Sequence, residues 1–232
     1  MQKTMYTSFL KKETVFNAIA IFISILGSFA VERYIQFNKE QAELEILENN
    51  LLYELEQNYF SLISLRGTLK SVIAVSDSTT SNWNEISSQK IKKYHQDNLY
   101  DNNERIEFIL SNSYGFSAKN MYFNSLKNSG LILKIERKEL RNEIEVVGSL
   151  INRNYYSSNQ KISEGIQAWF HEKALIEESL NFDLIFDKHK DFELLKLLSD
   201  RRRNEIYKLY GVENDIEFLE RLIDDIKTKG MF

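Results

Sequence analysis

The longest run of uncharged residues lies near the start of the chain, between Glu13 and Glu32. As an α-helix, these eighteen residues would extend about 27 Å, close to the bilayer core thickness of about 30 Å. The pattern therefore predicts a transmembrane helix at residues 14–35, a short tail at 1–13 and a helical domain at 36–232. A buried helix of a soluble protein and a cleaved export signal are the alternatives.

Basic residues are slightly more frequent before this helix than after it. Lys3, Lys11 and Lys12 precede the helix, whereas Arg33 and Lys39 follow it. Positively charged flanks tend to stay in the cytoplasm. We therefore expect a cytoplasmic amino terminus in a bacterial inner membrane, with the helical domain on the periplasmic side.

Small and polar residues recur on one face of the predicted membrane helix, at spacings of three and four. They are Asn17, Ala20, Ser24, Gly27 and Ser28. In lipid, small residues at this spacing allow two helices to approach closely. The face is predicted to mediate self-association, and an oligomeric pore lined by its polar members is the alternative.

Apolar residues recur in heptads in the charged region that follows, which predicts a helix running on from the membrane segment to Val75. The stripe consists of Leu44, Leu51, Leu55, Asn58, Leu62, Leu65 and Leu69. We interpret it as a helical interaction stripe. It would pair either with a second copy or, within the chain, with a second long helix predicted at Leu140 to Leu180.

The remaining pattern predicts further helices separated by loops. A loop is expected at Ser76 to Asn84, and the second long helix is expected to bury Ile166, Trp169, Ile176 and Leu180. Short helices are predicted at 85–100, 104–110 and 118–128, Gly130 is expected as a left-handed cap, and two last helices at 192–210 and 215–227 are separated by Gly211. The predicted fold class is all-α, an extended bundle behind a membrane helix.

Composition agrees with long helices and narrows the function. The chain has no proline, which would interrupt helices, and no cysteine, which excludes disulfides and thiolate chemistry. The net charge of −4 argues against nucleic acid as a partner. Membrane lipids, a second copy or another membrane protein are the expected partners.

Residues with catalytic potential are few and lack a complete motif. His171-Glu172 has no second histidine at zinc-protease spacing. Asp183, Asp187, His189 and Asp191 are close enough in sequence to suggest a metal site, but the same residues suit a charged loop between helices. We therefore expect no catalytic, cofactor or metal residues, and an enzyme with a site near His171 or His189 is the alternative.

The basic run Arg201-Arg202-Arg203 cannot form one face, because successive helical residues point about 100° apart. Ion pairing with Asp200 and Glu205 is the favoured interpretation.

Two stretches carry a recognisable pattern beyond periodicity. The first is LENNLLYELEQN at residues 47–58, and the second contains Tyr122, Leu126, Ser129, Gly130, Ile135, Glu139, Leu140 and Arg141. With the opening apolar helix, both stretches resemble an uncharacterised family of bacterial, single-span, helix-rich proteins. The chain departs from the family at Phe37-Asn38, where Trp-Asn is common. The resemblance implies a membrane-anchored helical architecture and no known activity. We therefore expect a single-pass interaction protein, such as a scaffold, assembly subunit or sensor.

Overall fold

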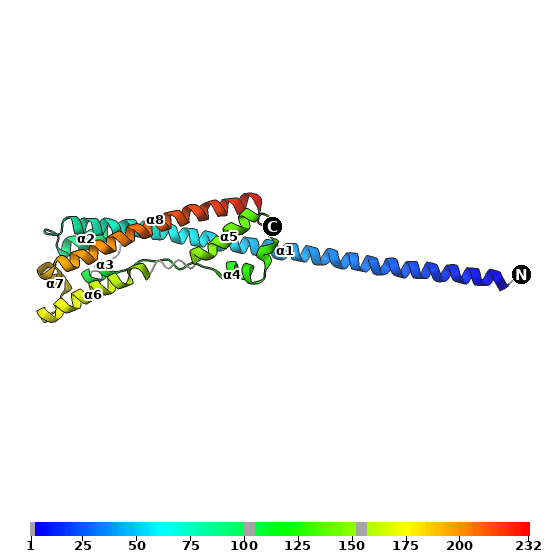
Figure 1. The fold of residues 1–232 in the computed structure, drawn as a ribbon, viewed down its shortest axis with the longest axis horizontal. Helices are drawn as coiled ribbons and strands as arrows, with labels where there is room; N and C mark the ends of the chain where they lie inside the picture. The colour runs from blue at the N-terminus through cyan, green and yellow to red at the C-terminus, as the bar shows by residue number, and fades with distance from the viewer. Residues whose placement is uncertain (1–2, 100–104, 152–156) are drawn as a thin grey trace. The chain divides into compact units, whose positions relative to one another are not determined.

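The structure is a computed structural model that describes residues 3–99, 105–151 and 157–232. Within these residues every regular element is helical, which confirms the all-α fold class (Figure 1). The helices are α1 (Lys3–Ser81), α2 (Ser88–Leu99), α3 (Ile106–Ser111), α4 (Met121–Asn128), the short 3₁₀ helix η1 (Leu131–Lys134), α5 (Lys138–Ile151), α6 (Ser157–Glu177), α7 (Phe182–His189) and α8 (Phe192–Lys229).

The chain divides into two compact units, and α1 contributes to both. The first unit comprises Met1–Asn49 with Phe232, and the second comprises Asn50–Met231. The helix predicted to continue from the membrane segment is present, since α1 is a single helix from Lys3 to Ser81. The second unit is the helical bundle.

The prediction of a loop at Ser76 to Asn84 is wrong for most of its length, because α1 continues to Ser81. The hydroxyl of Thr79 donates to the Val75 carbonyl at 2.8 Å, and that of Thr80 donates to the Ser76 carbonyl at 2.9 Å. These side chains bond to their own helix instead of opening it. Burial of Thr79 adds tertiary support that the local composition does not reveal.

In the bundle, α8 runs antiparallel to the later part of α1. Three ion pairs join the two helices in reversed order: Glu56 with Lys227, Lys70 with Glu213, and Asp77 with Arg202. Figure 1 shows the two helices side by side. The partner that lies along α1 over most of the bundle is therefore the last helix.

The predicted break at Gly211 is also wrong, since α8 is one helix from Phe192 to Lys229. A glycine within a helix costs about 1 kcal/mol relative to alanine, which tertiary packing can offset. Val212 is fully buried directly after the glycine, and buried Lys208 and Asp215 flank it. Packing on both sides thus overrides the local preference.

The second long helix predicted from Leu140 to Leu180 appears as α5 and α6, and the stretch between them, including Tyr155, lies outside the described residues. Ile166 and Trp169 are buried as predicted. Ile176 and Leu180 are exposed, so the prediction that the second long helix buries them is wrong. The helix ends at Glu177, and its apolar face continues through Phe170 and Ala174.

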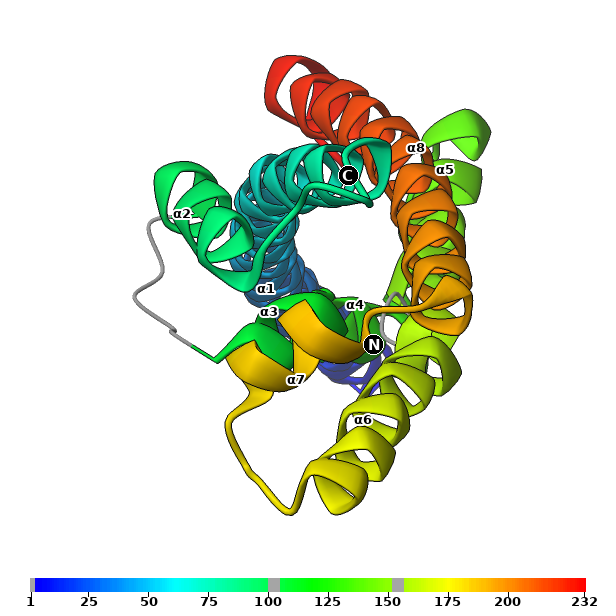
Figure 2. The same cartoon turned by 90° about the vertical axis from the view of Figure 1, so that its left-hand side faces the viewer.

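The shorter predicted helices are present as α2, α3 and α4 with shifted ends, and Gly130 has the expected left-handed backbone, with φ of 73°. One apolar core joins α1, α2, α3, α6, α7 and α8, which surround it in the end-on view of Figure 2. Its largest fully buried members include Phe170, Phe186 and Ile106. Charged side chains that bond to backbone groups lie next to this core, as when Arg201 donates to the carbonyl of core residue Leu110.

Candidate functional site

The first candidate site is the apolar part of α1. None of the described side chains from 15 to 43 is buried, and Phe16, Phe22 and Phe29 each expose more than half of their surface. In the described chain, one helix is long and apolar enough to cross a membrane, and none of its most apolar stretch is buried. An exposed apolar surface of this extent is typical of a segment that contacts lipid or another protein.

The small-residue face of this helix satisfies its own hydroxyl groups. The Ser24 hydroxyl donates to the Ala20 carbonyl, and the Ser28 hydroxyl donates to the Ser24 carbonyl, each at 2.9 Å. Gly27 has open space where a β-carbon would stand, and Asn17 is exposed. A shallow groove follows this face from Ser24 to Lys39. The face therefore offers close approach, and its serines need no partner for hydrogen bonding.

The predicted interaction stripe is buried within the single chain. Its members Leu44, Leu51, Leu55, Asn58, Leu62, Leu65 and Leu69 are all buried. The stripe is therefore buried within the single chain. The helix predicted at Leu140 to Leu180 was the partner expected within the chain, whereas the ion pairs place α8 along this part of α1.

Asn58 and Glu54 on α1 hold the segment that leads into α4. The Asn58 side chain donates to the Lys119 carbonyl at 2.9 Å and accepts from the Lys119 amide at 2.8 Å. The Glu54 carboxylate accepts from the Tyr122 amide at 2.8 Å and from the Phe123 amide at 3.0 Å. Because the first amides of a helix have no intrahelical partner, Glu54 caps α4 from a distant part of the sequence. Asn58 thus fixes contacts inside the chain.

A second group of buried charges lies on α8 and was not predicted. Arg201 donates to the carbonyls of Ile109, Leu110 and Asn112 at the end of α3, at 3.1, 2.6 and 2.7 Å. It thereby supplies a missing cap to α3. Burial lowers the pKa of Arg201, opposed by the nearby Glu205 carboxylate.

Glu205 and Lys208 complete this buried group. Lys208 donates to the Tyr114 carbonyl at 2.8 Å and pairs with Glu205 at 3.3 Å, and the Asn159 side chain donates to Glu205. Burial lowers the pKa of Lys208, and the Glu205 charge opposes this shift. The sequence signal was present, since residues 201, 205 and 208 continue the buried positions Leu194 and Leu198 along one helical face.

The other two arginines of the run form ion pairs. Arg203 pairs with Asp200 at 2.5 Å, as predicted, whereas Arg202 pairs with Asp77 of α1. The run thus makes three separate contacts and forms no single basic face.

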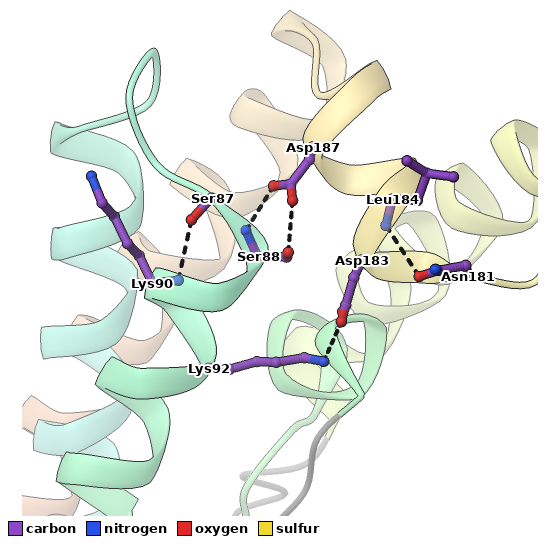
Figure 3. A network of polar contacts seen from close by, with 8 residues as sticks. All are labelled: Ser87, Ser88, Lys90, Lys92, Asn181, Asp183, Leu184 and Asp187. Carbon is purple, nitrogen blue, oxygen red and sulfur yellow. Dashed lines mark hydrogen bonds and ion pairs between the residues drawn. The ribbon is translucent and has the colours of Figure 1, made fainter.

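The acidic residues near His189 lie mainly on helix α7, which corrects the expectation of a loop. Asp187 accepts from the Ser88 amide at 2.7 Å and from its hydroxyl at 2.8 Å, which caps α2 (Figure 3). Asp183 pairs with Lys92 (Figure 3). These carboxylates therefore join α7 to α2.

His189 and Asp191 have separate partners. His189 Nε2 lies 2.7 Å from a Glu177 oxygen, and Lys188 donates to the same carboxylate at 2.7 Å. These hydrogen bonds, that from Lys188 first, lower the pKa of Glu177. Asp191 accepts from the indole of Trp169 at 3.1 Å.

The predicted cluster is therefore divided among several structural contacts. Among the described residues, no three His, Asp or Glu side chains are placed to hold a metal ion. His171 is exposed, with Nε2 4.0 Å from Glu107, and Glu172 contacts Lys173. Lys173 also lies 3.8 Å from Asp191, so a lysine, and no shared ligand site, links the His171 pair to the His189 group among these contacts.

Compared with known proteins, the sequence matches no family model, no curated protein and no solved structure. The function is therefore inferred from the residues themselves. In the described residues, one apolar helix is exposed. In the bundle, buried charged side chains form hydrogen bonds with backbone groups of the same chain.

Proposed function

We propose that this protein is a single-pass membrane protein that acts by interaction, with residues 14–35 as its anchor and the helical bundle as its soluble domain. One observation carries the proposal: the apolar side chains of this helix are exposed, whereas the apolar stripe from Leu51 to Leu69 is buried in the same chain. Because the chain buries its apolar stripe but leaves the apolar helix exposed, the exposed helix is suited to an apolar environment such as a lipid bilayer.

The basic residues before the helix support a cytoplasmic amino terminus and a periplasmic bundle in a bacterial inner membrane. Lipid is then the first partner of the anchor. Its second partner is another copy of the chain or a different membrane protein that contacts the face of Ala20, Ser24 and Ser28. The resemblance to single-span, helix-rich proteins agrees with this architecture. Scaffold, assembly subunit and sensor are the roles it fits.

Charged substitution tests the anchor. Phe22→Lys with Leu26→Lys places two charges at the helix centre, where each costs about 2.5–3.5 kcal/mol of insertion free energy. We expect the wild-type protein to stay in alkali-washed membranes and the double variant to appear in the supernatant. Tyr53→Lys with Phe60→Lys is the matched control, because these residues of α1 are as exposed but lie in the bundle. Equal retention of both variants would refute the anchor.

Bulky substitution tests self-association separately. Ser24→Leu with Ser28→Leu keeps the helix apolar but blocks close approach, so insertion should survive and crosslinking in native membranes should fall. The expected loss is about 1 kcal/mol of association free energy. Ser61→Leu with Ser64→Leu is the control, since both serines are exposed on α1 within the bundle. If the first pair crosslinks as well as wild type, the face does not mediate association.

A further inference from the structure

A polar groove lies between the end of α3 and the first half of α6, beside the backbone that Arg201 of α8 holds. Its volume is about 380 Å³, within the range of small-molecule sites. Ser111, Asn112 and Ser113 line one side, and Phe108 lies at the same end of α3. The other side comes from four polar residues of α6: Gln160, Ser163, Glu164 and Gln167.

These α6 residues share one helical face, because their spacings are three, four and seven. Ile166 and Phe170 lie beside this face on α6, at its border with the apolar core. The tight packing of α6 thus presents a row of amide, hydroxyl and carboxylate groups toward α3. Because α3 and α6 both pack in the same core, that core fixes the position of both sides of the groove.

Two hydroxyl groups in this groove are buried without a hydrogen bond. The oxygens of Ser113 and Ser163 are inaccessible and have no partner among the described residues. Burying a hydroxyl without a partner is unfavourable, and such groups need an explanation in a folded protein. Nearby polar groups are paired, since Gln167 donates to Ser111 at 3.3 Å and Gln160 donates to Glu164 at 2.9 Å.

The backbone beside these hydroxyls is held in place. Arg201 donates to the Asn112 carbonyl, which fixes the chain directly before Ser113. A preorganised groove loses little entropy when a ligand binds. The two serines are therefore fixed in place, and rotation about the Cα–Cβ bond would turn each buried hydroxyl toward a ligand in the groove.

We propose that this groove binds a neutral saccharide. None of the described lining residues is a lysine or arginine, and Glu164 adds a negative charge, so the lining does not favour phosphate or carboxylate ligands. Serine, asparagine and glutamine both donate and accept, as neighbouring sugar hydroxyls require. The partly exposed ring of Phe108 offers an apolar surface for the C–H face of a sugar.

Binding can be measured on the full chain in detergent micelles, with N,N′-diacetylchitobiose and maltose as probes and saturation-transfer NMR as the readout. We expect saturable binding of at least one probe, and Gln167→Ala should weaken it roughly three- to tenfold by removing one hydrogen-bonding group. Gln96→Ala on exposed α2 is the matched control and should bind like wild type. Absence of saturable binding by both probes, or equal binding by both variants, would overturn the proposal.

The unpaired hydroxyls provide a second test, with a variant that is not expected to destabilise the fold. Ser113→Ala with Ser163→Ala removes groups that the free protein leaves unsatisfied, so its melting temperature should rise while saccharide binding weakens. A lower melting temperature with unchanged binding would show that the hydroxyls serve the fold alone, and would contradict the proposal.

Discussion

The polar side chains of α1 form different kinds of hydrogen bonds in its apolar part and in the bundle. Along residues 15–37, the hydroxyl groups of Ser24 and Ser28 bond to carbonyls four residues earlier in the same helix. In the bundle, α1 instead supplies Glu54 and Asn58 to backbone groups more than sixty residues away in sequence. A helix with only local bonds is suited to lipid, where no water is present to satisfy the backbone.

The bundle shows what short helices require. Three of them, α2, α3 and α4, receive caps from Asp187, Arg201 and Glu54, which lie on α7, α8 and α1. Isolated helices of this length are marginal in water, so their stability depends on such tertiary contacts. The stability of the bundle should therefore depend strongly on single charged residues that cap its helices. The apolar helix has no such dependence among the contacts described above.

The largest effect is expected at Glu205. Glu205→Ala leaves Lys208 and Arg201 buried without their nearby negative charge, and removal of one member of a buried pair costs about 3–5 kcal/mol of unfolding free energy. Glu213→Ala is the control, because its ion pair with Lys70 is exposed and should contribute less than about 1 kcal/mol. Denaturant unfolding of both variants in micelles measures the difference. Equal losses would show that the buried group does not hold the bundle.

A smaller effect is expected at Glu54. Glu54→Ala leaves the amides of Tyr122 and Phe123 without their acceptor, at an expected cost of about 2 kcal/mol. Hydrogen exchange at these two amides should accelerate, while exchange within α8 changes little. Glu56→Ala, which removes a contact to Lys227, is the neighbouring control. Unchanged exchange at both amides would contradict capping from α1.

The smallest effect is a pH dependence at Glu177. Its pKa in the folded protein lies below the ordinary value of 4.5, because Lys188 and His189 stabilise the carboxylate. The unfolded state therefore binds the proton more readily, so this contribution is present above pH 4.5 and is lost as pH falls through the folded pKa. Glu177→Gln should flatten the acid side of the stability profile slightly, and Glu193→Gln on exposed α8 should not. Identical profiles for both variants would exclude this contribution.

The sequence predicted the features that depend on periodicity. The uncharged run and the heptads from Leu44 to Leu69 lie on α1, and the last helix predicted at 215–227 lies within α8. The heptad stripe is buried, and so are Ile216 and Ile226 on the last helix. Spacing is a direct record of which side chains share a helical face.

The features that depend on contacts distant in sequence were not predicted. Ser76 to Asn84 reads as a loop and Gly211 as a break, yet burial of Thr79 and Val212 stabilises helix at both places. Asp187 and Asp191 suggested a possible metal cluster, but their partners, Ser88 and Trp169, lie far away in the sequence. Spacing alone cannot identify such partners.

Single-cysteine labelling in sealed inner-membrane preparations tests the central claim most directly, because the natural chain contains no cysteine. Ile23 and Tyr53 both lie on α1 and expose 62% and 59% of their surface, so the folded chain alone gives no reason for different reactivity. With a membrane-impermeant maleimide on the periplasmic face, we predict that Tyr53→Cys labels readily and that Ile23→Cys labels only after denaturation. Equal labelling of the two variants in sealed membranes would contradict a membrane-spanning anchor.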